Sequence, residues 1–251
     1  MTAAVLSTRG LDKSFGSLVV ASNIEINLPA GARYALIGPN GAGKTTLINL
    51  ITGMIRPDGG QILLGEQEIT MLRPEERVKR GLVRTFQINT LFPHLNALEA
   101  VMLAVCERRG YAGTWWQKLS TYPDALDEAY AILRSLRLGV HAYRPTRELA
   151  YGQQRLLEIA LALATKPKVL LLDEPAAGVP QDESAELFSV IADLSQDIAV
   201  LFIEHDMNVV FRFANRIIVM VGGRILLEGP PSDIAADARV REVYLGKTRH
   251  G

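Results

Sequence analysis

A glycine-rich run that ends in a lysine and two threonines is the strongest chemical signal in the sequence. It reads Gly38-Pro39-Asn40-Gly41-Ala42-Gly43-Lys44-Thr45-Thr46 and fits the pattern G-x-x-x-x-G-K-[ST]. Glycines let the backbone curl until successive N–H groups face one anion, and a helix that begins near Lys44 adds its positive end. Lys44 supplies a charge for β- and γ-phosphates, and the Thr45 hydroxyl is an oxygen ligand suited to Mg²⁺. This segment, the phosphate loop, therefore predicts a nucleotide site.

Two adjacent carboxylates follow an apolar run further along the chain. Residues 169–172 are all Val or Leu, and Asp173 and Glu174 come directly after them. A continuous apolar run is typical of a buried parallel strand, and ligands bind at the carboxyl ends of such strands. We expect Asp173 to approach Mg²⁺ through a water, and Glu174 to orient or deprotonate an attacking water. On its own the pair could equally be a helix cap or a surface feature, but the phosphate loop favours the functional interpretation.

Strand and helix patterns alternate around these segments. Strands are predicted at 24–28, 34–37, 61–64, 82–86, 169–172, 199–203, 217–221 and 224–227. Helices are predicted at about 44–52, 96–109, 123–138 and 152–165, with another that starts near 182. The alternation predicts an α/β fold with a mainly parallel sheet.

The domain organisation follows from the same pattern. We expect one domain over residues 1–251, with a core made of 1–87 and 166–228. The helical stretch 88–165 reads as an inserted subdomain, and 229–251 as a C-terminal helical extension. No repeat and no Ser/Gly-rich linker interrupts the chain.

Composition excludes several classes of protein. The 251 residues are 48% apolar and 22% charged, which is ordinary for a globular protein and excludes collagen-like and disordered chains. Lys and Arg number 27, as do Asp and Glu, so no basic excess supports nucleic-acid binding. The single cysteine, Cys106, excludes an internal disulfide. No apolar run reaches about 18 residues, and the N-terminus lacks a signal-peptide pattern. We expect a soluble, intracellular chain whose membrane role, if it has one, is peripheral.

One further segment and three single residues resemble motifs of a known protein family. The segment 149–154 reads Leu-Ala-Tyr-Gly-Gln-Gln, which resembles the signature motif of ATP-binding cassette (ABC) ATPases, commonly Leu-Ser-Gly-Gly-Gln. Gln87 in Arg-Thr-Phe-Gln resembles the Q-loop glutamine, and His205 in Ile-Glu-His-Asp-Met resembles the switch histidine. Phe15 matches the aromatic residue that stacks on adenine in this family. The resemblance covers essentially the whole chain and preserves the family's order of motifs: Phe15, Lys44, Gln87, Gly152, Asp173, His205.

This resemblance implies a fold and a site. The fold is a P-loop NTPase cassette with a RecA-like core, a small antiparallel β subdomain and an inserted helical subdomain. The cofactors are ATP and Mg²⁺. The implied catalytic residues are Glu174, His205 and Lys44, and the implied metal-binding residues are Thr45, Gln87 and Asp173. The implied nucleotide contacts are Phe15, Gly38, Pro39, Asn40, Gly41, Ala42, Gly43, Lys44, Thr45, Thr46, Gln87, Tyr151, Gly152 and Gln153.

Within the family, the chain is most similar to the branched-chain amino acid importer type, and to the longer of its two ATPase subunits. Its Arg-Thr-Phe-Gln, Leu-Ala-Tyr-Gly-Gln-Gln, Leu-Asp-Glu-Pro-Ala-Ala-Gly and Glu-His-Asp-Met runs carry this resemblance. It implies a peripheral subunit on the cytoplasmic face of the inner (plasma) membrane, with no nucleic-acid partner. Two transmembrane permeases, a second ATPase subunit paired head to tail and, indirectly, an extracytoplasmic solute-binding protein are the implied partners. The ATPase pair is a homodimer or a heterodimer.

Departures and alternatives remain. The family's D-loop often ends in Asp or Asn before a proline, whereas here Pro180 directly follows Val179, and proline has no N–H to donate to an opposite subunit. Tyr151 is larger than the usual glycine, so the approach to the nucleotide must differ there. The adjacent Trp115 and Trp116 fit either a membrane partner or local packing. Two alternative functions are open. A similar ATPase drives lipopolysaccharide extraction in another family, and some ABC ATPases act on DNA or ribosomes without a membrane partner.

Overall fold

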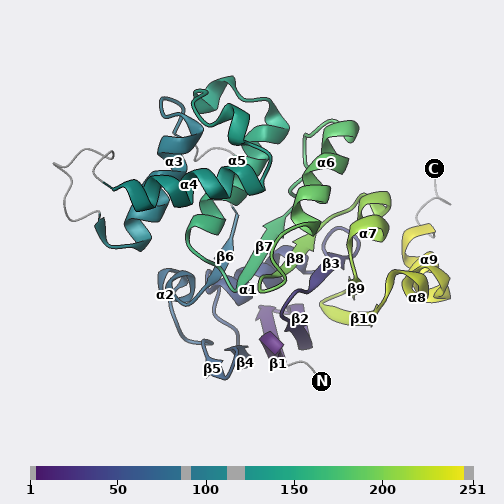
Figure 1. Ribbon diagram of the computed structural model, residues 1–251. Coiled ribbons are helices and arrows are strands. Elements are labelled where there is room, and N and C mark those ends of the chain that lie inside the picture. Colours follow the sequence, from purple (N-terminus) through teal and green to yellow (C-terminus); the bar gives the residue numbers. More distant parts are fainter. Residues whose placement is uncertain (1–3, 86–91, 112–121, 246–251) are drawn as a thin grey trace. The chain divides into compact units, whose positions relative to one another are not determined.

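Strands and helices alternate along the chain in the computed structural model, which describes residues 4–85, 92–111 and 122–245 (Figure 1). The strands are β1 (Ala4–Phe15), β2 (Leu18–Pro29), β3 (Arg33–Ile37), β4 (Gly59–Leu64), β5 (Gln67–Glu68), β6 (Leu82–Arg84), β7 (Val169–Asp173), β8 (Ala199–Ile203), β9 (Arg216–Val221) and β10 (Arg224–Gly229). The helices are α1 (Lys44–Thr52), α2 (Pro74–Lys79), α3 (Ala97–Arg108), α4 (Pro123–Ser135), α5 (Tyr151–Ala164), α6 (Gln181–Ala192), α7 (Met207–Phe213), α8 (Pro231–Ala236) and α9 (Ala238–Leu245), with the 3₁₀ turns η3 (Gly139–His141) and η4 (Thr146–Glu148).

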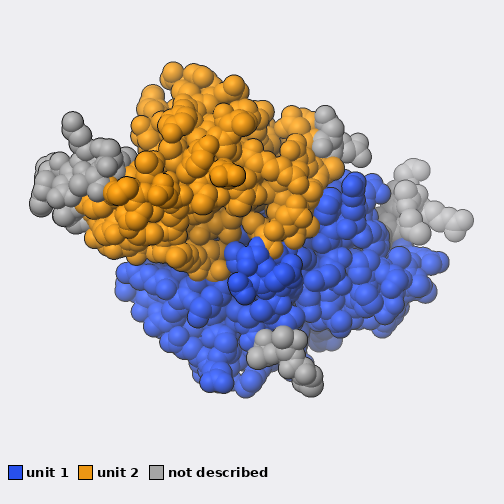
Figure 2. Space-filling model, in the orientation of Figure 1, with its two compact units in different colours: residues 1–83, 168–175, 195–251 blue, residues 84–167, 176–194 orange. Residues whose placement is uncertain are grey.

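The chain folds into two compact units, coloured separately in Figure 2. Unit 1 holds residues 1–83, 168–175 and 195–251, and unit 2 holds residues 84–167 and 176–194. The chain therefore passes between the units four times, and one of these crossings lies directly after Pro175.

A six-stranded sheet of unit 1 has the order β10-β9-β3-β8-β7-β6. The pairs β9–β3, β3–β8 and β8–β7 are parallel, and β10 is antiparallel to β9. All five residues of β8 are buried, as expected of a central strand covered on both faces. In the pairing register, Ile203 of β8 lies opposite both Leu36 and Asp173, so β3, β7 and β8 end at one edge. The predicted α/β fold with a mainly parallel sheet is confirmed.

The second sheet of unit 1 is antiparallel, with the order β2-β1-β4-β5. Ile24, Ile26 and Leu28 are buried on one face of β2 while their neighbours are more exposed, which matches the alternation predicted for a half-buried strand. These side chains join one apolar core with Leu36 of β3 and Leu201 of β8.

Unit 2 is helical. Helices α3, α4 and α5 contact one another, and α5 also contacts α6. Helix α3 begins where it was predicted, because the Asn96 side chain accepts from the Glu99 N–H at 2.9 Å and the Glu99 carboxylate accepts from the Asn96 N–H at 2.9 Å.

The predicted end of the helix at 123–138 is wrong by three residues. Helix α4 ends at Ser135, and Arg137 adopts the left-handed conformation (φ 61°) just beyond it. The Leu138 N–H bonds the Leu133 carbonyl at 2.8 Å, and the Arg137 N–H bonds the Arg134 carbonyl at 3.1 Å. This is a Schellman closure, which usually takes glycine at the position that Arg137 holds. Strand β6 also ends earlier than predicted, at Arg84, and residues 86–91 lie outside the described residues.

A buried arginine holds the C-terminal end of α1, the helix that follows the phosphate loop. Arg77 of α2 is 1% exposed, and burial lowers the pKa of its guanidinium to about 10. The guanidinium donates to the carbonyls of Leu50 (2.8 Å) and Ile51 (2.6 Å) in α1, and to those of Thr70 (2.7 Å) and Leu72 (3.0 Å). A cation is favourable at the negative end of a helix, so Arg77 stabilises α1 by charge as well as by hydrogen bonding.

Replacing Arg77 with Met should lower the free energy of unfolding by about 3 kcal/mol, because buried carbonyls lose charged donors. Urea unfolding followed by circular dichroism measures this loss. Lys79→Ala, an exposed change on the same helix, is the matched control and should stay within about 0.5 kcal/mol of the wild type. Equal stability of Arg77→Met and the control would contradict the interpretation.

Candidate functional site

The predicted site residues of unit 1 follow the ends of three neighbouring strands. The phosphate loop leaves β3 at Gly38, Asp173 ends β7, and His205 comes two residues after β8. Because these strands are parallel neighbours in register, the three segments reach the same edge of the sheet.

The phosphate loop is curled and packed against its surroundings. Gly41 (φ 79°) and Gly43 (φ 103°) are left-handed, and the Ala42 N–H bonds the Pro39 carbonyl at 3.1 Å. The Gly223 N–H bonds the Ala42 carbonyl at 2.9 Å. Helix α1 begins directly after the loop at Lys44, and no side chain in the described part of the chain caps its N-terminus. This is the arrangement that binds phosphate at a helix N-terminus.

Lys44 brings a positive charge to the loop. Its Nζ donates to the carbonyls of Gly38 at 2.8 Å and Pro39 at 3.2 Å. Burial lowers the pKa of Lys44, while the carboxylates of Glu174 and Asp173 act in the opposite direction. The ammonium group therefore lies within the electrostatic reach of the acidic strand end.

Glu174 and His205 lie side by side. The Glu174 Oε1 and His205 Nδ1 atoms are 3.8 Å apart, and both side chains are exposed enough to meet a ligand. Glu174 has a left-handed backbone (φ 49°), and its N–H donates to the Ile203 carbonyl at 3.1 Å. A glutamate in this conformation is uncommon and is held here by the edge of β8.

Phe15 lies at the end of β1 in the hairpin that leads to β2. Its side chain is 50% exposed, with the Lys13 ammonium 5.4 Å from the ring centroid. Phe15 is therefore not a core residue, and its ring is open to a planar ligand.

The donor chemistry of this edge fits Mg²⁺. Thr45 offers a hydroxyl and Asp173 a carboxylate, both hard oxygen donors. Among the described residues, no group of three His, Cys, Asp or Glu could hold a metal by itself.

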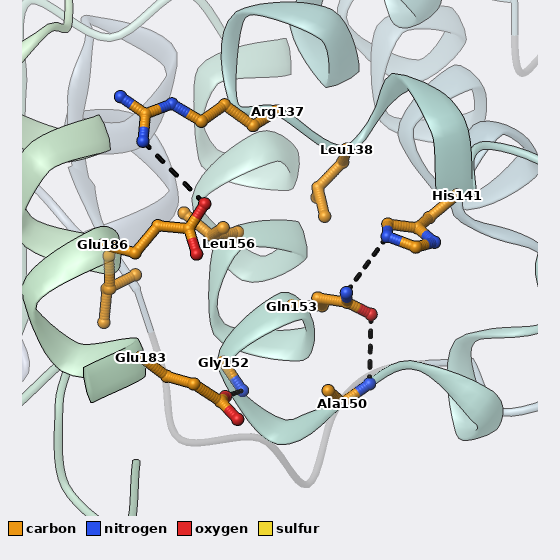
Figure 3. Close-up of a pocket in the computed structure, with 10 residues that line it drawn as sticks. Arg137, Leu138, His141, Ala150, Gly152, Gln153, Leu156, Glu183 and Glu186 are labelled. Carbon is orange, nitrogen blue, oxygen red and sulfur yellow. Dashed lines mark hydrogen bonds and ion pairs between the residues drawn. The ribbon is translucent and has the colours of Figure 1, made fainter. Parts of the chain in front are cut away.

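The signature segment, residues 149–154, lies in unit 2 at the start of α5. The Gly152 N–H donates to Glu183 Oε2 at 3.3 Å (Figure 3). Gln153 accepts from the Ala150 N–H at 3.1 Å, and its Nε2 lies 3.0 Å from His141 Nε2. A cavity of about 270 Å³ opens beside these residues, between Arg137 and Glu186 on one side and the start of α5 on the other.

Two residues of this region were missed by sequence reasoning. Glu183, on α6, reaches the Gly152 N–H, and Arg155, four residues after Tyr151 on α5, bonds the Tyr151 hydroxyl at 3.1 Å. The i,i+4 spacing could have revealed Arg155, whereas nothing local pointed to Glu183. Gln87, Trp115 and Trp116 lie outside the described residues.

Within the described parts of the chain, no helix is both long and apolar enough to cross a membrane.

Sequence comparisons find relatives that match nearly the whole chain. A family model described as "ABC transporter" matches residues 21–177, and one described as "Branched-chain amino acid ATP-binding cassette transporter" matches residues 224–250. The chain is 39% identical to the high-affinity branched-chain amino acid transport ATP-binding protein LivG of Escherichia coli K12, over 98% of this chain and 100% of that one. It is 36% identical to the corresponding protein BraF of Pseudomonas aeruginosa, with the same coverage.

Solved structures of ATP-binding cassettes resemble this chain along nearly its whole length. The ADP conformation of an ATP-binding cassette from an ABC transporter superposes with a TM-score of 0.86 at 32% identity, over 98% of this chain and 100% of that one. A nucleotide-free cassette superposes with a TM-score of 0.82 at 31% identity, over 96% and 98%.

The two loop glycines should respond differently to alanine. A Cβ on Gly43 would lie 2.4 Å from the Val20 carbonyl oxygen, whereas a Cβ on Gly41 would meet nothing within 4 Å. Gly41→Ala should therefore cost only its left-handed conformation, about 1 kcal/mol, and Gly43→Ala clearly more. Urea unfolding of both variants measures the difference, and equal losses would show that the loop does not pack on Val20 as described.

Proposed function

The chain belongs to the ATP-binding cassette (ABC) transporter family, and on that premise we propose that it is the ATP-hydrolysing subunit that energises an importer for branched-chain or related amino acids. Members of this family are ATPases that bind nucleotide. The observation that carries the proposal is the resemblance to LivG and BraF over 98% of the chain, together with the branched-chain amino acid match at residues 224–250.

The proposed site divides the work of binding among the residues at the strand ends. The curled backbone of residues 38–43 and the Lys44 ammonium bind the β- and γ-phosphates of ATP, and the Phe15 ring stacks on adenine. Thr45 and Gln87 would hold Mg²⁺ directly, and Asp173 would hold it through a water. The ion supplies positive charge that neutralises the phosphate oxygens.

Hydrolysis requires a water in line with the bond to the γ-phosphorus. In our proposal Glu174 orients this water and accepts its proton as the water oxygen attacks, while the bond from phosphorus to the bridging oxygen of ADP breaks. His205 contacts the γ-phosphate beside Glu174. Their separation of 3.8 Å supports a shared role at one reacting group.

The proposed working form is a head-to-tail pair of ATPase chains. One chain contributes the phosphate loop, and the other contributes Gly152 and its neighbours in the signature segment, so that ATP closes the pair and hydrolysis opens it. The second chain is a copy of this one or a related subunit. Pro180, the residue before α6, donates no backbone hydrogen bond, so the contact across the pair differs there from family members with Asp or Asn.

The proposed location is the cytoplasmic face of the plasma membrane, as a peripheral subunit. Two transmembrane permeases are the direct partners, and an extracytoplasmic solute-binding protein acts through them. ABC relatives that extract lipopolysaccharide, or that act on DNA or ribosomes, are the competing assignments, and partner identification separates them.

Replacing Glu174 with Gln should lower the ATP hydrolysis rate at least 100-fold, because the amide cannot accept the proton of the attacking water. Binding of ATP should persist, and the variant should elute as an ATP-dependent dimer in gel filtration. Glu66→Gln, an exposed change in the turn before β5, is the control and should hydrolyse ATP at the wild-type rate. Wild-type hydrolysis by Glu174→Gln would refute the assignment of the base.

Gentle detergent extraction of native membranes, followed by affinity purification and mass spectrometry, should recover the chain with two multi-spanning permeases and an ATPase partner. In the reconstituted complex with its binding protein, leucine, isoleucine or valine should stimulate ATP hydrolysis, while glutamate should not. Recovery with lipopolysaccharide-transport partners, or only in the soluble fraction with nucleic acid, would overturn the importer proposal.

A further inference from the structure

Tyr151 occupies the position where ABC signature motifs commonly carry glycine, and its side chain bonds a segment far away in the sequence. We propose that Tyr151 and Arg155 are positioning residues that fix residues 176–178 to the start of α5, and thereby set the position of Glu174 for hydrolysis. The inference rests on the proposed function, because it concerns the placement of that carboxylate.

Three hydrogen bonds make the contact. The Tyr151 hydroxyl donates to the Ala177 carbonyl at 3.2 Å and accepts from Arg155 Nη2 at 3.1 Å. Arg155 Nη2 also donates to the same carbonyl at 3.3 Å. The three groups thus form a closed set, called here the Tyr151–Arg155–Ala177 contact.

Packing reinforces the hydrogen bonds. The Arg155 guanidinium lies 5.3 Å from the centre of the Tyr151 ring, within the range of a cation–π interaction. Gly178 is left-handed (φ 79°), and a Cβ placed there would lie 3.2 Å from the Tyr151 hydroxyl and 3.4 Å from the ring. Residues 176–178 therefore run directly along the tyrosine ring.

Arg155 is itself immobilised. It is 6% exposed, and its Nη1 lies 3.1 Å from Oε2 of Glu158, which is 8% exposed. Burial raises the pKa of Glu158, and the guanidinium acts in the opposite direction. A buried arginine bound to a carboxylate on its own helix has little freedom, so it presents Nη2 to Ala177 in one orientation.

The Tyr151–Arg155–Ala177 contact lies close to Glu174 in the sequence. Ala176 is the first residue of unit 2 after the crossing that follows Pro175, and Glu174 lies two residues before Ala176. Glu174 is held on its own side by the hydrogen bond from its N–H to Ile203. Residues 174–177 are thus bound at both ends, and each residue spans at most about 3.6 Å. Only Pro175 and Ala176 separate Glu174 from the residue that Tyr151 and Arg155 bind, so in our proposal a change at this contact alters the position of Glu174.

Two substitutions at position 151 remove the contact in part or in full. Tyr151→Phe keeps the ring beside Gly178 and Arg155 but removes the hydroxyl, whereas Tyr151→Gly restores the common family residue and removes both. We expect kcat for ATP hydrolysis to fall about fivefold in Tyr151→Phe, which loses both hydrogen bonds of the hydroxyl but keeps the bond from Arg155 to Ala177, and further in Tyr151→Gly. The KM for ATP should stay within about twofold of wild type in Tyr151→Phe.

Hydrogen–deuterium exchange of the nucleotide-free chain provides a readout that does not require hydrolysis. Peptides that cover residues 174–180 should exchange faster in both variants than in the wild type. Tyr143→Phe is the matched control, because Tyr143 belongs to the same unit and is 76% exposed. Its exchange and its kcat should match those of the wild type.

The outcomes separate the possibilities. Unchanged exchange at 174–180 in both variants would refute the contact, and unchanged kcat would refute its role in hydrolysis. A raised KM with wild-type kcat would show that the Tyr151 hydroxyl acts on nucleotide binding and not on Glu174, which also overturns the proposal. A wild-type chain that neither binds nor hydrolyses ATP would refute the proposed function, while the exchange data would still decide the contact.

Discussion

The parallel pairing of β3 with β8, and of β8 with β7, is the constraint on which the site depends. Neighbouring strands lie about 4.8 Å apart, so segments that leave three adjacent strands at one edge begin within about 10 Å of each other. Residues from three distant stretches of sequence, Lys44, Glu174 and His205, meet for this reason. A single slip in the register at Ile203 would separate the carboxylate from the phosphate loop.

The phosphate loop is held from both directions. On one side, the Val20 carbonyl and the Met220 side chain leave no room beside Gly43, and the Gly223 N–H donates to the Ala42 carbonyl. On the other, Arg77 binds the carbonyls at the far end of α1. Helix α1 is thus anchored at its C-terminal end, and no described side chain caps its first turn. The N–H groups can serve an anion because the rest of the element is fixed without using them.

Local patterns predicted much of the fold and the chemistry of the loop. The strands predicted at 169–172 and 199–203 and the helix predicted at 44–52 were correct, because each depends on residues adjacent in sequence. The end of α4 was wrong, since a tertiary setting lets Arg137 adopt a conformation that local propensity assigns to Gly139. The distant partners of Tyr151 and Gly152 could not be predicted for the same reason. They come from residues 177 and 183, which only the packing of α5 and α6 brings near.

The hydrogen bonds of Arg77 have an evolutionary consequence, because all of its acceptors are backbone carbonyls. The side chains at positions 50, 51, 70 and 72 contribute nothing to these bonds, so they are free to drift among residues of similar size without losing an acceptor. Position 77 has no such freedom, since no compensating change elsewhere in the chain can supply five planar donors. Of the residues in this contact, only Arg77 must therefore keep its side chain for the hydrogen bonds to persist.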